Sequence, residues 1–296
     1  MRYSSRFFLY APFAGLLLLA AIAMVHWWLV ASALAKRLDA VNGHEIIPGV
    51  RIGFSHKTLA GFPFRLDILL KNLRIEVAEV DGPIIWTSED FAMHELTYGR
   101  VQAIFEAAGR QTLSWTDAHG AVHRFAFLPG TFRASSILQD GRLVRFDSEI
   151  IDLDGGTFRA RSAQLHMRTS RAGIDLYLSV GEAHVQGGYA AVLGPDISNL
   201  IVNGTLDRSD KLQALLRGER RLQDALEEWR QSGGAIVNDF AVTKGKTTAH
   251  LDGRLALNTH HDAVGALVSA GPGDATGRVL NFAGTRIVFG SGLARP

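Results

Sequence analysis

The sequence contains no cysteine, which excludes disulfide bonds, thiolate metal ligands and a cysteine nucleophile. It also lacks an excess of either charge, because 31 Lys and Arg residues stand against 29 Asp and Glu residues, a formal net charge of +2. This balance excludes a polybasic nucleic-acid-binding protein and an acidic disordered chain, so we expect no nucleic-acid partner. Hydrophobic residues make up 47% of the 296 positions and charged residues 20%, which is enough for a substantial core.

Charged residues are also missing from one long stretch near the start, residues 7–35. Crossing a bilayer takes about 20 apolar residues, and we expect residues 9–28 to be the part buried in hydrocarbon. Trp27 and Trp28 then fall at the level of the lipid headgroups, where aromatic side chains gather. The stretch therefore predicts a single membrane-crossing helix.

A cleaved signal peptide is the alternative interpretation of this stretch. Arg2 and Arg6 form a basic start, and Ala33-Leu34-Ala35 resembles a cleavage site with small residues. Length favours an uncleaved anchor, since the apolar part of a secretory signal spans about 7–15 residues. We expect the short N-terminal tail to stay in the cytoplasm, because long domains that follow an anchor are translocated largely regardless of their charge.

Beyond the apolar stretch, side chains alternate between apolar and polar as they do along strands that are covered on one face. Phe64, Leu66, Ile68 and Leu70 alternate with charged neighbours, and Leu176 and Leu178 do the same further along. Three Asp-Gly pairs, typical of tight hairpin turns, punctuate the pattern: Asp140-Gly141, Asp154-Gly155 and Asp252-Gly253. The sequence predicts a mainly β protein with a long, twisted antiparallel sheet, open or partly closed and groove-like.

One segment departs from the strand pattern, because apolar residues over 209–232 recur at helical spacing. Ser209 is the predicted N-cap, Gly218 divides the segment into two short helices, and Gly233-Gly234 ends it. The predicted organisation is a cytoplasmic tail (1–8), a transmembrane anchor (9–34), a linker (35–45), the first part of a β domain (46–208), a helical insert (209–233) and the second part of the β domain (234–296).

Motifs that would carry chemistry are incomplete. Gly245-Lys246-Thr247 lacks the earlier glycine and the following helix of a phosphate-binding loop, so we interpret it as a hairpin tip. Gly290-Ser291-Gly292 lacks the spacing of a serine-hydrolase elbow. We interpret His260-His261-Asp262 as a solvated turn, because adjacent side chains on a strand point to opposite faces. We expect no catalytic residue, no metal and no cofactor, and thus not an enzyme.

The segment Gly61-Phe62-Pro63-Phe64-Arg65 is unusual, because Pro63 restricts Phe62 and removes a hydrogen-bond donor at the start of a strand. We interpret it as a structural strand entry whose two phenyl rings plug the end of the core. The alternative is a direct role in binding.

Together with Gly61-Phe62-Pro63-Phe64-Arg65, the stretch from Trp229 through Gly233-Gly234 resembles an uncharacterised family of bacterial membrane-anchored proteins. Its members look like distant relatives of AsmA. Asp252-Gly253-Arg254 and the closing Arg286-Ile287-Val288-Phe289 extend the resemblance over nearly the whole chain. The resemblance implies a β-rich periplasmic domain held at the inner membrane by a single crossing, with a role in envelope lipid traffic or outer-membrane assembly. It implies no catalytic residue.

A long sheet with one apolar face must close, fold on itself or bind something apolar. We therefore expect a lipid-handling or assembly factor whose partners are membrane lipid and other envelope proteins. The expected acyl-chain contacts are Phe64, Leu66, Ile68, Leu70, Leu176 and Leu178. The alternatives are a structural envelope scaffold without a ligand, and a periplasmic hydrolase.

Overall fold

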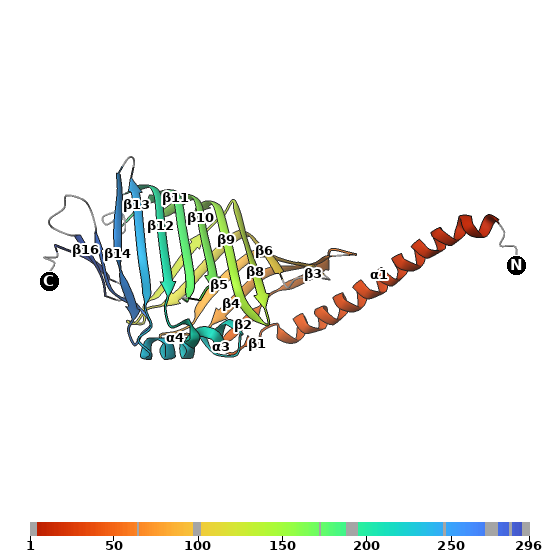
Figure 1. Cartoon of the computed structure of the whole chain (residues 1–296), viewed down its shortest axis with the longest axis horizontal. Coiled ribbons are helices and arrows are strands. Elements are labelled where there is room, and N and C mark those ends of the chain that lie inside the picture. Colours follow the sequence, from red (N-terminus) through yellow and green to blue (C-terminus); the bar gives the residue numbers. More distant parts are fainter. Residues whose placement is uncertain are drawn as a thin grey trace.

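The computed structural model describes residues 5–63, 65–96, 102–171, 173–187, 195–244, 247–269, 278–283 and 286–291. The predicted fold class is confirmed: a long antiparallel sheet follows an apolar N-terminal helix, and a short helical insert interrupts it (Figure 1). The helical elements are α1 (Ser5–Val41), the 3-10 turn η1 (Ser209–Leu212), α3 (Gln213–Leu216) and α4 (Leu222–Gln231). The strands are β1 (Glu45–Ile47), β2 (Val50–Gly53), β3 (His56–Ala60), β4 (Arg65–Val77), β5 (Ile84–Leu96), β6 (Gln102–Thr116), β7 (Val122–Phe127), β8 (Thr131–Gln139), β9 (Arg142–Asp154), β10 (Phe158–Thr169), β11 (Ile174–Val185), β12 (Asp196–Leu206), β13 (Ile236–Lys244), β14 (Thr247–Leu257), β15 (Ala263–Ser269), β16 (Arg278–Ala283) and β17 (Arg286–Ser291).

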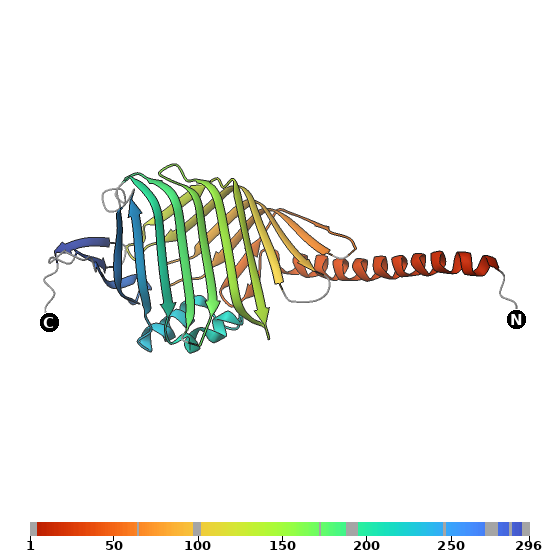
Figure 2. The same cartoon turned by 45° about the horizontal axis from the view of Figure 1, so that its top comes forward.

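Helix α1 has 37 residues and projects away from the sheet for most of its length (Figures 1 and 2). Among the described residues it is the one helix long and apolar enough to cross a membrane, and a signal sequence has the same character. The helix continues to Val41, through most of the segment 35–45 that was expected to be a linker. Its apolar periodicity extends to Leu34 and Leu38, which pack on the sheet, and this packing keeps the segment helical.

Each strand from β4 onward pairs antiparallel with a neighbour, in the order β4-β5-β6-β8-β9 and then consecutively from β9 to β17. Strand β7 pairs with the far end of β6, while β2 and β3 share the other edge of β4. The alternating pattern predicted this antiparallel sheet. Because consecutive strands pair, short turns suffice to connect most of them.

Two of the three predicted Asp-Gly turns are confirmed and one is wrong. Asp140 and Gly141 have φ values of 51° and 72° in the β8–β9 hairpin, and Asp154-Gly155 lies at the turn after β9. Gly253 instead lies inside β14, opposite Leu267 of β15. A Cβ there would stand 2.1 Å from the carbonyl oxygen of Ala266, so this glycine permits close strand approach and makes no turn. The predicted hairpin tip Gly245-Lys246 lies outside the described residues.

The sheet is strongly bent, so that β10–β14 lie in front of β4–β8 in both views (Figures 1 and 2). Helix α4 lies against both halves of the sheet. Leu226 of α4 packs against the cluster around Ile174 of β11, and it also lines a hollow with Ile84 of β5 and Leu113 of β6. The apolar faces of the two halves are therefore turned toward each other at this end.

The helical insert fills one end of the bend, as Figure 2 shows beneath β10–β13. Its buried core consists of Leu212, Ala225 and Trp229 against Ile174. Gly218, with φ of 69°, separates α3 from α4 as predicted. Ser209 is the first residue of η1, and its predicted role as N-cap is wrong, because Arg208 takes that position without a side-chain cap.

Candidate functional site

The feature with most functional potential is the apolar face of the bent sheet. Strand register aligns mostly apolar side chains in two cross-strand rows, the first from β4 to β15 and the second from β4 to β12. The first row is Ile68, Met93, Phe105, Ala134, Ser148, Leu165, Leu178, Val202, Phe240, Leu251 and Ser269. The second row is Leu70, Phe91, Ala107, Phe132, Ile150, Ala163, Val180 and Leu200. We call these two rows the apolar face.

Burial varies along the apolar face. Ile68 and Leu70 are 2% and 4% exposed, and Val180 is 8% exposed in a second cluster. Between these two buried clusters, the side chains of Phe105, Phe132 and Leu165 remain half-buried and belong to neither cluster. With strands about 4.8 Å apart, the first row is about 48 Å long. The face is thus a long apolar strip, packed at its β4 end and partly open in its middle.

The opposite face is polar and is held by histidine–carboxylate pairs. On β4 and β5, His94 Nδ1 lies 2.6 Å from Asp67 Oδ1, and on β9 and β10, His166 Nδ1 lies 2.7 Å from Asp147 Oδ1. Burial acts to raise the pKa of Asp67, but hydrogen bonds from His94 and Arg65 outweigh it and hold the pKa below its usual value. The same balance, with His166 and Arg145, lowers the pKa of Asp147.

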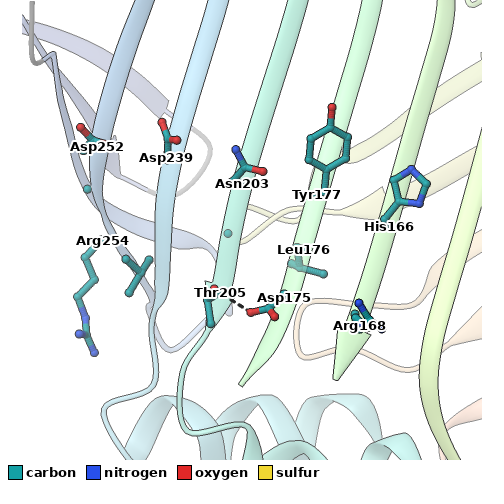
Figure 3. A pocket seen from close by; sticks show the side chains of 13 residues that line it. His166, Arg168, Asp175, Leu176, Tyr177, Asn203, Thr205, Asp239, Asp252 and Arg254 are labelled. Atoms are coloured by element: carbon teal, nitrogen blue, oxygen red, sulfur yellow. Dashed lines mark hydrogen bonds between the residues drawn. The ribbon is translucent and has the colours of Figure 1, made fainter. Parts of the chain in front are cut away.

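A hollow of about 810 Å³ lies on the polar face of β10–β14 (Figure 3). Its labelled side chains include His166, Tyr177 and Asn203, and the hydroxyl of Thr205 donates to Asp175 at 3.0 Å. The described residues contain no group of three His, Asp or Glu side chains placed to hold a metal ion. Most of the residues that line the hollow are polar or charged, and the hollow lies on the side of the sheet opposite the apolar face.

The predicted acyl-chain contacts fall into different environments. Leu66 is 6% exposed and, like Ile68 and Leu70, leaves no area for a ligand. Leu176 packs against the helical insert, while Leu178 is half-buried in the middle of the apolar face. Phe64 lies outside the described residues. Alternation placed these side chains on one face of the sheet, but it gave no sign that Leu34 and Leu38 of α1 cover the β4 end of that face.

The segment Gly61–Arg65 contacts helix α1. The indole Nε1 of Trp27 donates to the carbonyl oxygen of Arg65 at 3.0 Å, and the Trp27 and Phe62 rings meet edge to face with centroids 5.8 Å apart. Phe62 is 49% exposed, so the prediction that its ring plugs the core is wrong. The Phe62-Pro63 peptide bond is cis, and β4 begins two residues after Pro63.

Gly61 is required by the turn before β4. Its φ is 94°, and its carbonyl oxygen accepts the backbone N–H of Arg65 at 2.9 Å. A Cβ at Gly61 would stand 2.6 Å from the Arg65 carbonyl oxygen, the same atom that accepts from Trp27. The guanidinium of Arg65 in turn binds Asp67 at 2.8 Å. The motif therefore fixes the carbonyl oxygen of Arg65 in the position where it accepts the hydrogen bond from Trp27 of helix α1.

Further contacts fix the second half of α1 along the sheet. Lys57 of β3 donates to the carbonyl oxygen of Ala35 at 2.6 Å and forms an ion pair with Asp39. Leu34 and Leu38 pack on the cluster formed by Ile68 and Leu70. The sequence gave no signal for this docking, since the contacts join residues far apart in the chain.

At the end of the sheet that holds the insert, two histidines join distant parts of the chain. His261 Nδ1 lies 2.6 Å from Glu79, and its Nε2 lies 3.5 Å from a carboxylate oxygen of Glu227. His260 Nδ1 lies 2.9 Å from Asp81. The side chain of His261 is 4% exposed, so the prediction of a solvated turn is wrong for this residue. The hydrogen bond with Asp81 raises the pKa of His260.

Trp229, Gly233 and Gly234, which the sequence singled out, lie together at the end of α4. Trp229 is 1% exposed, and its Nε1 donates to the carbonyl oxygen of Asp207 at 2.6 Å. Gly234 lies directly under the indole ring, since a Cβ there would be 2.4 Å from Trp229 Cε2. Gly233 has φ of 77°, as the predicted helix end requires.

Comparison with protein families gives one finding. A family model described as an uncharacterised protein conserved in bacteria, DUF2125, matches residues 27–270. The chain belongs to this family. The matched range includes the docked half of α1, the Gly61–Arg65 segment and the helical insert. No curated protein and no solved structure matches the chain.

Proposed function

We propose that the protein is a single-pass anchored envelope protein that binds the acyl chains of membrane lipids on its apolar face. The observation that carries the proposal is the register-linked strip of apolar side chains, of which Phe105, Phe132 and Leu165 remain half-buried. Each methylene group removed from water is worth about 0.8 kcal/mol, so partial shelter of a long chain repays the cost of ordering it. An extended strip suits an extended hydrocarbon chain.

Two further considerations support the proposal: the apolar helix and the resemblance to AsmA-like proteins. Helix α1 is apolar enough to cross a membrane, and its water-side half docks on the same edge of the sheet where the apolar face begins. We place α1 in the inner membrane and the sheet in the periplasm, as the charge-free length of residues 7–35 and the AsmA-like resemblance imply. Lipid handling or outer-membrane assembly is the role this arrangement supports. A scaffold without a ligand is the competing function.

The experiment uses a photoactivatable phospholipid and two matched variants of the full-length chain. Val202 is half-buried in the first row of the apolar face, and the adjacent Asn203 is exposed on the polar face. We expect Val202→Asp to abolish lipid labelling, because a charge cannot lie against hydrocarbon. Asn203→Asp adds the same charge on the other side and should leave labelling intact.

Two outcomes would contradict the proposal. One is a folded wild-type chain that takes no label in native membranes, which favours the scaffold function. The other is equal loss of label in both variants, since a surface charge would then explain it. Thermal melting of each variant in detergent shows whether the fold is retained, and Val202→Ala provides a milder change if the aspartate variant unfolds.

A further inference from the structure

If α1 is a membrane anchor, as the proposed function states, its length fixes the depth of Trp27 in the bilayer. The inference below rests on that anchor. An α-helix rises 1.5 Å per residue, so residues 9–28 span about 30 Å, the thickness of the hydrocarbon layer. Trp27 therefore lies at the outer end of the crossing, at the level of the headgroups. Lys36 and Arg37 are exposed about two turns further along α1, on the water side.

Phe62 shares this depth because it touches Trp27. The two ring centroids are 5.8 Å apart, and the Trp27 indole is also hydrogen-bonded to the carbonyl of Arg65. The contact is one of a series along α1: Trp27 with Gly61–Arg65, Ala35 with Lys57, and Leu38 with the cluster around Ile68. From residue 27 to residue 38 the helix advances about 16 Å, so the series fixes the direction of the helix relative to the sheet.

Phe62 is 49% exposed although its ring meets that of Trp27 edge to face, so part of the phenyl ring is free to contact a further partner. Contact of this ring with lipid would remove apolar surface from water, which is favourable. The cationic side chains of Lys36 and Arg37 would add attraction to an anionic lipid surface.

We propose that Phe62 is a membrane-surface contact, seated among the phospholipid headgroups beside Trp27. The Gly61–Arg65 segment leads directly into β4, where the apolar face begins with Leu66 and Ile68. This placement sets the β4 end of the apolar face, which α1 covers, beside the membrane surface. The partner is a phospholipid bilayer surface, not a second protein.

The absence of cysteine from the chain permits a direct test of depth. Phe62→Cys and the control Val122→Cys, a position 74% exposed in strand β7, are each labelled with an environment-sensitive fluorophore in the full-length chain. The protein is placed in nanodiscs containing phosphatidylglycerol. We expect quenching by aqueous iodide to be several-fold weaker at position 62 than at position 122. Equal quenching at the two positions would overturn the proposal.

A second pair of variants avoids the label and retains an aromatic ring. Phe62→Trp preserves the edge contact with Trp27, and Val122→Trp is its control. Brominated lipid should quench the added emission of Phe62→Trp and leave that of Val122→Trp unchanged. Protection of position 62 in native membranes but not in nanodiscs of purified protein would show that a protein covers it, and the membrane contact would then be wrong.

The outcomes also separate this inference from the acyl-chain proposal. If position 62 is open to iodide while lipid labelling still depends on Val202, the surface contact is wrong and the acyl-chain site stands. If intact-mass analysis shows a mature chain that begins after Trp27, the anchor and this contact both fail.

Discussion

Replacing Trp229 by alanine is the most informative perturbation of the fold. The indole is 1% exposed, fills the space between α4 and the end of the sheet, and satisfies the carbonyl of Asp207. Removal of a buried aromatic ring costs about 3–5 kcal/mol through lost burial and the cavity left behind. The unpaired Asp207 carbonyl adds about 1–3 kcal/mol if water does not reach it.

The assay is thermal melting of the full-length chain in detergent, with the wild type beside each variant. For a domain of this size, 1 kcal/mol shifts the melting temperature by roughly 2–4 °C, so we expect Trp229→Ala to melt at least about 6 °C lower. Trp229→Phe retains most of the volume and should recover more than half of the loss. Gly234→Ala perturbs the same ring from the opposite partner, because its Cβ would lie 2.4 Å from the indole, and it should also lower the melting temperature.

An unchanged melting temperature in Trp229→Ala would refute the reasoning. It would mean that the insert is not held to the sheet by this side chain. A substitution at Val237, which is 50% exposed on the polar face of β13, serves as the control, because Val237→Ala removes far less buried area than Trp229→Ala. The melting temperature of Val237→Ala should lie close to that of the wild type.

Three further predictions concern the turn before β4, the histidine contacts and the N-terminus. Gly61→Ala should destabilise the chain by about 1–3 kcal/mol through backbone strain and the clash with the Arg65 carbonyl, whereas Gly43→Ala, with a similar φ of 80° and nothing within 4 Å, should show the strain alone in urea unfolding. Because Asp81 raises the folded-state pKa of His260, their contact stabilises the fold fully below the unfolded value of about 6.5 and is lost as pH rises through the folded value. The melting temperature of the wild type should therefore approach that of Asp81→Asn between about pH 6 and 8, and a constant difference would contradict this assignment. Intact-mass analysis should find α1 retained, whereas a mature chain starting at Lys36 would identify a secretion signal.

The sequence alone determined the features that depend on local order along the chain. Charge-free residues 7–35 predicted the apolar helix, alternation predicted the antiparallel strands, and helical spacing with Gly233-Gly234 predicted the insert and its end. These succeed because side-chain period and backbone preference are properties of neighbouring residues. Alternation also separated the apolar face from the polar face, since β pairing in register preserves that division across the sheet.

Only the tertiary structure decided which parts of the apolar face are covered. Alternation treats Ile68 and Leu178 alike, yet α1 covers the first and the second remains half-buried. Gly253 had the sequence of a turn, but pairing on both sides placed it within β14. The contacts of Trp27 with Phe62 and of His261 with Glu79 join segments 35 and 182 residues apart. Docking of α1 on the sheet brings the first pair together, and the bend of the sheet brings the second pair together. That bend arises from the summed twist of many strands, which no local pattern records.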